Sequence, residues 1–96
     1  FTQSGSTARR VSKCRPSVPI LAITASAEVG RRLQLCWGVQ VFQLAAPSTL
    51  EELFAMGATL PQRVGLAEPG DLVVITAGVP LGVPGTTNLL KVEKIA

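Results

Sequence analysis

The sequence contains no histidine and no tyrosine, and it has a single tryptophan and only six acidic residues. Without histidine, neither a Ser-His-Asp triad nor a Cys-His pair can be built from this chain. The acids form no close cluster, so the two carboxylates of a glycosidase have no obvious candidates. The lysine-containing phosphate loop of nucleotide-binding proteins is also absent. We therefore expect no catalysis by this chain alone.

Metal, membrane and export signals are equally scarce. The only cysteines, Cys14 and Cys36, cannot supply four zinc ligands, and no metal is expected. Both are interpreted as small buried residues in a reducing cytoplasm. No apolar run approaches the ~18 residues of a membrane-spanning helix, and the N-terminus does not resemble a signal peptide. These features predict a cytoplasmic protein without a membrane partner.

Positive charge is concentrated in the first third of the chain. Six basic residues lie there against the single acid Glu28: Arg9, Arg10, Lys13, Arg15, Arg31 and Arg32. Such a region could serve an anion site, or it could be a solvated helix face. Because no aromatic residues alternate with the arginines, nucleic acid is not expected as a partner.

Short apolar runs alternate with helical patterns along all 96 residues. Strands are predicted over 19–24, 39–44, 72–76 and 89–95, the last at a sheet edge. Helices are predicted over 7–14, from 26 to about 37, and from 48 to about 60. This alternation predicts one α/β domain with a mainly parallel sheet flanked by helices.

Two of the helices carry recognisable capping signals. Ser26 can cap the second helix, whose inner stripe is predicted to contain Val29, Leu33, Cys36 and Trp37. In the third helix, a capping box is predicted from residues 48 and 51, and a kink or early end before the proline at position 61.

Two loops are candidate sites. The first combines hydroxyls, a glycine and a helix start at the end of a strand: Thr2, Gln3, Ser4, Gly5, Ser6 and Thr7. Backbone N–H groups at a helix start attract phosphate, although Ser4 and Ser6 could instead be simple helix caps. The second loop, 78–88, is long and rich in glycine and proline. It could cover a bound ligand or be an ordinary connection.

A series of short motifs, in order and with matching spacing, resembles one known family over the whole chain. The motifs are Ser-Gly-Ser-Thr-Ala-Arg at 4–9, Arg-Pro at 15–16, Trp-Gly-Val at 37–39, Gly-Asp-Leu-Val-Val at 70–74, Thr-Ala-Gly-Val-Pro at 76–80 and Gly-Thr-Thr-Asn at 85–88. The chain resembles the C-terminal domain of bacterial-type pyruvate kinases.

This resemblance implies a function within a larger enzyme. Pyruvate kinases transfer phosphate from phosphoenolpyruvate to ADP in a separate barrel domain that holds magnesium and potassium. The C-terminal domain is a three-layer α/β/α fold without a cofactor of its own. It binds an allosteric sugar phosphate and helps to form the homotetramer.

The resemblance also assigns site residues. It implies that the loop 2–7 holds an effector phosphate, and that a second loop closes over the effector, with Gly82, Val83, Pro84, Gly85 and Thr86 as its matching positions. The family's partners for a second phosphate have no clear counterpart, since Arg63 is the only basic residue in the matching region. A sugar monophosphate, a nucleoside monophosphate or an inorganic anion is therefore as suitable as fructose 1,6-bisphosphate.

The resemblance further implies that the domain of residues 1–96 is truncated at its N-terminal side. The first, central strand of the sheet would be missing, with residues 1–2 as its last step. Three other functions stay open. The chain could be a stand-alone α/β domain that binds a phosphorylated ligand, a small enzyme acting on such a ligand, or a structural module with a vestigial site.

Overall fold

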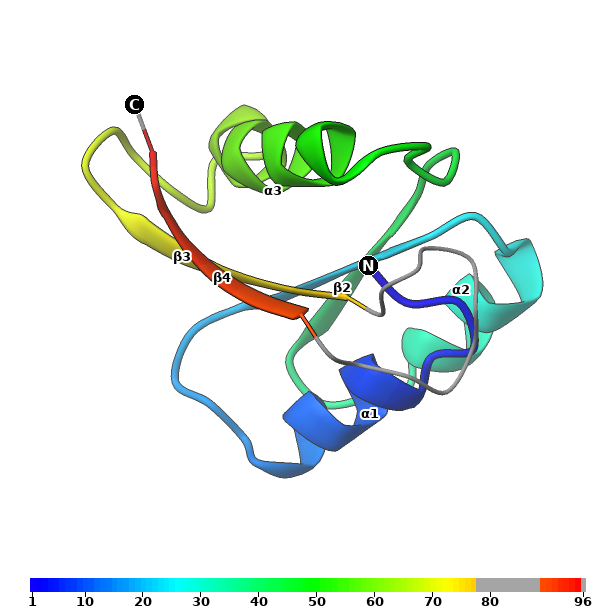
Figure 1. The fold of residues 1–96 in the computed structure, drawn as a ribbon. Coiled ribbons are helices and arrows are strands. Elements are labelled where there is room, and N and C mark those ends of the chain that lie inside the picture. The colour runs from blue at the N-terminus through cyan, green and yellow to red at the C-terminus, as the bar shows by residue number, and fades with distance from the viewer. Residues whose placement is uncertain (78–88, 96) are drawn as a thin grey trace.

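The computed structural model describes residues 1–77 and 89–95. Its elements alternate along the chain as the apolar pattern predicts (Figure 1). They are α1 (Ser6–Lys13), β1 (Ile20–Thr24), α2 (Ala27–Leu33), β2 (Val39–Gln43), α3 (Leu50–Arg63), β3 (Leu72–Ala77) and β4 (Leu89–Lys94). The α/β class expected from the sequence is confirmed.

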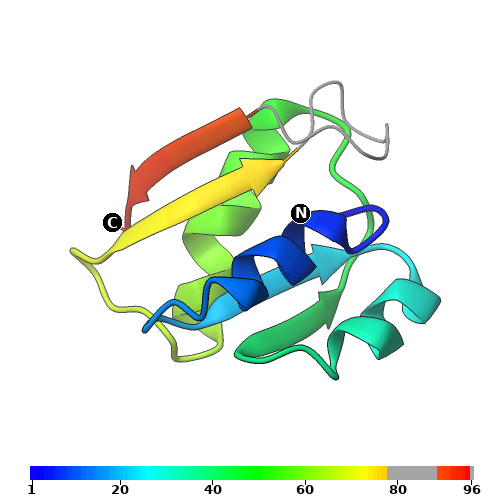
Figure 2. The same ribbon diagram turned by 90° about the horizontal axis from the view of Figure 1, so that it is seen from below.

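The first half of the chain forms a parallel pair of strands covered by two helices. Strands β1 and β2 pair in register from Ile20 opposite Val39 onward, and α2 connects them. Helices α1 and α2 lie against this sheet, as Figure 2 shows. Between helices and sheet, Ala8, Ala22 and Leu33 form a buried cluster. Ala22 in the middle of β1 is therefore buried against these helices.

The second half forms an antiparallel pair covered by α3. Strands β3 and β4 pair with Val74 opposite Val92, and α3 contacts both of them. Leu53 of α3 packs with Ile75 and Ala77 of β3 in a second buried cluster. Among the described strands, β4 pairs only with β3, in agreement with the predicted edge strand.

The first two residues lie between the two sheets. The amino group of Phe1 donates to the carbonyl oxygen of Thr76 at 3.0 Å, and the N–H of Thr2 donates to that of Ile23 at 2.9 Å. Successive residues of an extended chain direct their N–H groups to opposite sides. Phe1 and Thr2 therefore connect β1 to β3, whose arrows point the same way in Figure 2.

Helix α2 begins as predicted but ends early. The Ser26 hydroxyl accepts from the N–H of Val29 at 3.2 Å, which confirms the cap. The helix ends at Leu33, and a turn follows before β2. The prediction that Trp37 belongs to the inner stripe is wrong: its side chain is 46% exposed, with the Arg15 guanidinium 5.5 Å from the ring centre.

Helix α3 begins one residue later than predicted and continues past its proline. Thr49, rather than Ser48, is the N-cap, and its hydroxyl accepts from the N–H of Glu52 at 3.1 Å. The Glu52 carboxylate accepts from the N–H of Ser48 at 2.8 Å, one residue before the N-cap, so the predicted capping box of residues 48 and 51 is not formed. The predicted early end at Pro61 is wrong, since the helix ends at Arg63.

Two further expectations from the sequence concern the burial of the cysteines and the lack of a membrane-spanning helix. Cys14 is exposed, so the expectation that it is buried is wrong, whereas Cys36 is partly buried against the first core cluster. Among the described residues, no helix is both long and apolar enough to cross a membrane.

Candidate anion-binding site

A tight turn connects the end of the sheet to α1. The Thr2 hydroxyl oxygen accepts a hydrogen bond from the N–H of Gly5 at 2.9 Å. Gly5 has a φ of 88°, in the left-handed region that glycine adopts at little cost. The Ser4 hydroxyl accepts from the N–H of Ser6 at 3.4 Å. These bonds direct the chain from Thr2 into the helix within a few residues.

The helix start differs from the capping role predicted for Ser4 and Ser6. Gly5 is the N-cap of α1, and no side chain makes a capping hydrogen bond there. Ser6 is the first helical residue, and the Ser4 hydroxyl accepts from its N–H. The prediction that Ser4 or Ser6 is the N-cap is therefore wrong.

The six predicted loop residues are brought together in one short turn, but at different depths. Thr2 and Gly5 are buried, whereas Gln3 is exposed. The remaining three loop residues, Ser4, Ser6 and Thr7, are partly buried. Because its hydroxyl holds the turn, Thr2 is suited to position the loop, and the other polar side chains lie nearer to solvent.

The N-terminus of α1 is more electropositive than that of either other helix in the described residues. Helices α2 and α3 have side-chain caps from Ser26 and Thr49, and both have glutamates in the first turn. Helix α1 has neither a capping side chain nor an acid in its first turn. Within residues 1–77 and 89–95, neither a side-chain cap nor a first-turn acid offsets this helix dipole, and an anion at this end is stabilised.

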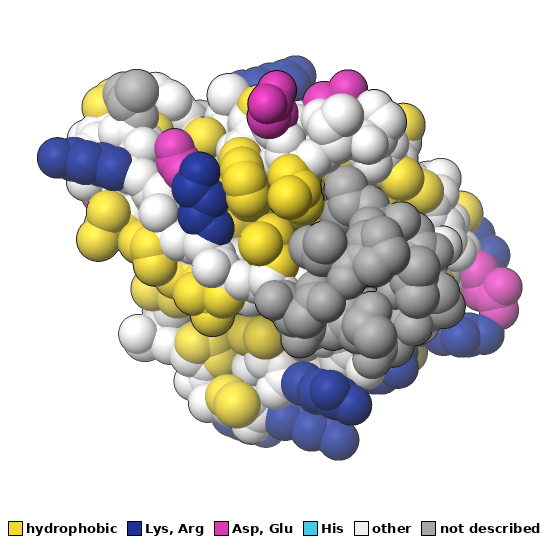
Figure 3. Space-filling view, in the orientation of Figure 1, with side chains coloured by type: hydrophobic (Ala, Val, Ile, Leu, Met, Phe, Trp, Pro, Cys, Tyr) yellow, Lys and Arg dark blue, Asp and Glu magenta, His cyan; other side chains and the backbone are white. Residues whose placement is uncertain are grey.

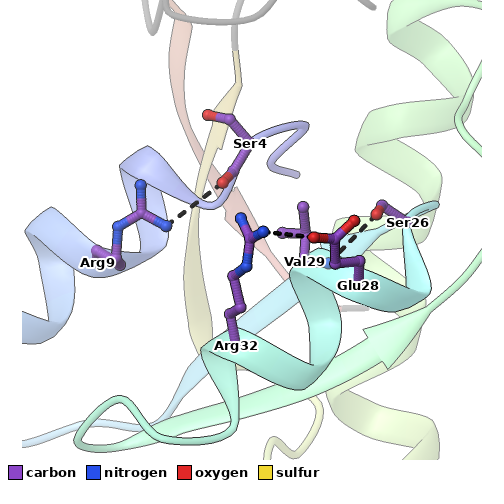
Figure 4. Close-up of polar contacts among 6 residues, drawn as sticks. All are labelled: Ser4, Arg9, Ser26, Glu28, Val29 and Arg32. Atoms are coloured by element: carbon purple, nitrogen blue, oxygen red, sulfur yellow. Dashed lines mark hydrogen bonds and ion pairs between the residues drawn. The ribbon is translucent and has the colours of Figure 1, made fainter.

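Two arginines from different helices lie beside the turn. The Arg9 guanidinium donates to the carbonyl oxygen of Ser4 at 3.4 Å, so the side chain folds back over the loop. On α2, Arg32 forms an ion pair with Glu28 one helical turn earlier (Figure 4). In the sequence, Arg32 stands out only as part of the basic pair at 31–32. Its distance from the loop along the chain gives no indication that the two lie close together in the fold.

The loop lies at the carboxyl ends of the strands, because Phe1 and Thr2 bond near the ends of β3 and β1. Open α/β sheets bind their ligands at this edge. Arg63 lies elsewhere: it is the last residue of α3, and the chain from there leads into the N-terminal end of β3. A 14-residue helix is about 21 Å long, so Arg63 is far from the helix end that follows the carboxyl end of β2.

The second predicted loop cannot be compared with this geometry. Gly82, Val83, Pro84, Gly85 and Thr86 lie outside the described residues. Within residues 1–77 and 89–95, no group of three or more potential ligand side chains is arranged to hold a metal ion.

Fold and site together define an α/β domain with a glycine-containing turn at the start of its first helix. The comparisons with known proteins specify the family. Residues 1–93 match the family model described as the pyruvate kinase alpha/beta domain. The chain therefore belongs to the pyruvate kinase α/β domain family.

Individual relatives cover nearly the whole chain. It is 46% identical over 95 residues to pyruvate kinase from Geobacillus stearothermophilus, which covers 99% of this chain and 16% of that protein. It is 48% identical over 96 residues to pyruvate kinase 2 from Synechocystis, again with 99% and 16% covered. The structure of Cryptosporidium parvum pyruvate kinase in complex with ADP matches with a TM-score of 0.85 and 36% identity, over 99% of this chain and 19% of that one.

Proposed function

We propose that this chain is the regulatory domain of a pyruvate kinase and that the loop 2–7 binds the phosphate group of an effector. The chain spans a fifth or less of the length of these relatives, for example 16% of the Geobacillus protein. The transfer of phosphate from phosphoenolpyruvate to ADP then belongs to other parts of the whole enzyme. Magnesium and potassium would be bound there as well.

The observation that carries this proposal is the uncapped start of α1. Its dipole, the glycine turn and the Arg9 guanidinium combine positive potential with hydrogen-bond donors on one side of the turn. The hydroxyls of Ser4 and Ser6 add polar groups at the same place. A phosphate is the anion that best uses several donors from one concave turn.

The position of Arg63 favours an effector with one phosphate. It lies at the end of α3 that leads to the opposite edge of the sheet, away from Thr2 and the turn. A second phosphate on a small sugar could not reach it from the loop. We therefore propose a sugar monophosphate or a nucleoside monophosphate as the ligand class.

The contribution to subunit contacts is supported by an apolar surface on the second sheet. Figure 3 shows hydrophobic side chains exposed over β3 and β4, with one basic side chain among them and further lysine and arginine side chains nearer the periphery. Four of the exposed large apolar residues belong to these strands: Leu72, Val74, Leu90 and Val92. Exposed apolar surface of this kind marks protein–protein contacts.

The ligand assignment is tested by thermal unfolding with phosphate, AMP, ribose 5-phosphate, glucose 6-phosphate and fructose 1,6-bisphosphate. A ligand present at 100 times its Kd should stabilise the fold by about 2.7 kcal/mol. The double variant Ser6→Ala, Thr7→Ala should lose the stabilisation. Ser17→Ala, the same chemical change at an exposed position beyond α1, should keep it. Equal responses in both variants would refute the site.

A further inference from the structure

Helix α1 packs on the first sheet although its sequence is mostly polar. Of its eight residues, only Ala8 and Val11 are apolar, and only Ala8 and Ser12 are buried. Helices α2 and α3 bury larger side chains, since Leu33 and Leu53 are at most 1% exposed. The stabilisation from apolar burial grows with the buried area, so the methyl group of Ala8 contributes much less than a leucine. Apolar packing is therefore a small part of what holds α1 in place.

The helix is also too short to be stable by itself. Isolated helices of fewer than about 12 residues are marginal in water, and α1 has eight. Its N-cap, Gly5, makes no side-chain capping hydrogen bond. An α1 segment that leaves the sheet therefore loses its helical structure as well, so detachment and local unfolding are one event.

Two contacts attach the C-terminal end of α1 to Trp37, in the turn between α2 and β2. The Ser12 hydroxyl donates to the carbonyl oxygen of Trp37 at 2.6 Å. Just beyond the helix, the Arg15 guanidinium lies 5.5 Å from the centre of the Trp37 ring. The turn itself is bonded to the end of α2, because the N–H of Cys36 donates to the carbonyl oxygen of Leu33 at 3.0 Å.

The hydrogen bond is the stronger of these two contacts. Ser12 is 6% exposed, so its hydroxyl has little access to water while α1 is in place, and loss of its partner is costly. Arg15 is exposed, and cation–π contacts at exposed sites are weak. A hydrogen bond also weakens steeply when its geometry is disturbed. A small displacement of α1 is therefore enough to break its main attachment to the turn.

The backbone just after α1 favours its release. Arg15 has a φ of 47°, the one positive value at a non-glycine residue within the described ranges. A side chain with a Cβ adopts this left-handed region at a cost, and a residue before proline prefers an extended backbone. Arg15 is relieved of this conformation when the segment leaves the sheet. The attached state thus contains strain that the Ser12 hydrogen bond opposes.

We propose that α1 opens from the sheet as one unit and that the Ser12–Trp37 hydrogen bond is the latch that holds it closed. Thr2 stays bonded to β1 through the carbonyl oxygen of Ile23, so the sheet itself remains intact when α1 opens. The latch lies at the opposite end of α1 from the turn of residues 2–7, about 12 Å away along the helix axis.

The link between this opening and regulation rests on the proposed function. A phosphate at the turn uses backbone N–H groups of the first helical turn, which are aligned only while α1 is helical and attached. A ligand that binds only the closed form lowers the open population about 100-fold at 100 times its Kd. Occupation of the turn at one end of α1 is therefore detectable at Trp37 and its neighbours at the other end.

The test measures opening by the alkylation of Cys36 with N-ethylmaleimide in a Cys14→Ser background. Cys36 is partly buried against the cluster that contains Ala8, whereas Cys14 is exposed and would react at once. Ser12→Ala removes the hydroxyl of the latch. Ser17→Ala makes the same change at an exposed position beyond α1 and is the matched control.

Amide hydrogen exchange in the same variants separates local opening from global unfolding. The N–H of Arg9 bonds to Gly5 within the α1 segment, and the N–H of Leu44 bonds to Thr24 in the first sheet. Exchange at Arg9 reports the opening of α1, and exchange at Leu44 reports the sheet.

Ser12→Ala should raise the alkylation rate of Cys36 and the exchange rate of Arg9 by about tenfold, with Leu44 unchanged, because the buried carbonyl of Trp37 loses its donor. The Ser17→Ala control should leave all three rates as they are. Unchanged rates in Ser12→Ala would overturn the proposal. An equal increase at Leu44 would also overturn it, since the whole domain would then be unfolding.

Ribose 5-phosphate is the probe for the link to the turn. At saturation it should slow the alkylation of Cys36 by about tenfold or more. If the amide signals of Gly5 and Ser6 respond to it while alkylation does not slow, the link is overturned and the phosphate site stands. If those signals do not respond, the phosphate proposal fails, and the Ser12→Ala result alone decides the latch.

Discussion

The hydroxyl oxygen of Thr2 lies 2.9 Å from the backbone nitrogen of Gly5, and this hydrogen bond closes the turn between the sheet and α1. Both residues are buried, so if the bond were broken, neither the hydroxyl nor the N–H could form a hydrogen bond to water instead without a cost in free energy. The bond connects the fold to the site, because the end of the sheet and the helix start meet at this point.

Replacing Thr2 with valine should therefore destabilise the fold by about 1–3 kcal/mol, since the buried N–H of Gly5 loses its acceptor while the side-chain volume is nearly unchanged. Thr2→Ser keeps the hydroxyl and should retain most of the stability. Urea unfolding measures both changes. A valine variant as stable as the serine variant would show that the bond does not hold the turn.

Gly5→Ala should be more destabilising than Gly65→Ala. Both glycines have positive φ, 88° and 80°, so both variants incur the backbone cost of about 1 kcal/mol. At Gly5 an added Cβ would also lie 3.2 Å from Val29 and 3.3 Å from Leu33, whereas Gly65 has nothing within 4 Å. The difference between the two unfolding free energies measures the packing around the turn. Equal losses would contradict this packing.

Gly57→Ala should destabilise the protein by about 1–3 kcal/mol, although alanine is the better helix former. An added Cβ would lie 2.4 Å from Cδ1 of Ile75, because α3 packs closely on β3 at this position. Ile75→Ala removes the clashing atoms, so in that background Gly57→Ala should cost much less. Additive losses in this double-mutant cycle would show that the contact is not the cause.

Stability should rise with pH through the titration of the Phe1 amino group. Burial lowers its pKa below the ordinary value of 8.0, so between the folded-state pKa and 8.0 the unfolded chain binds more protons than the folded one. The cost is fully present below the folded-state pKa and is lost by 8.0. Acetylation of the amino group should remove this part of the pH dependence. An unchanged slope after acetylation would assign it to other groups.

Much of the fold could be predicted because its signals are local. The apolar runs of β1 and β3 and the cap at Ser26 are each determined by a few neighbouring residues. The N-cap of α3 was predicted wrongly, because two adjacent residues, Ser48 and Thr49, each precede a glutamate by three residues. The carboxylate of Glu52 selects the second, an outcome that spacing cannot distinguish.

The site was predictable in position but not in detail. The hydroxyls, the glycine and the helix start predicted where the turn lies. The N-cap, however, is Gly5, because the backbone N–H of Gly5 donates to the Thr2 hydroxyl and so fixes the turn before the helix. Trp37 shows the opposite failure. Helical spacing continues to it in the sequence, but the helix ends at Leu33, so the indole is partly exposed.

The central claim is that the turn of residues 2–7 binds a phosphate group, and backbone NMR titration tests it most directly. Adding AMP or ribose 5-phosphate to the chain should shift the amide signals of Gly5, Ser6 and Thr7 in a saturable manner, while Gly65 and Gly70 stay unchanged. Saturable shifts at other amides, with no change at the turn, would contradict the claim.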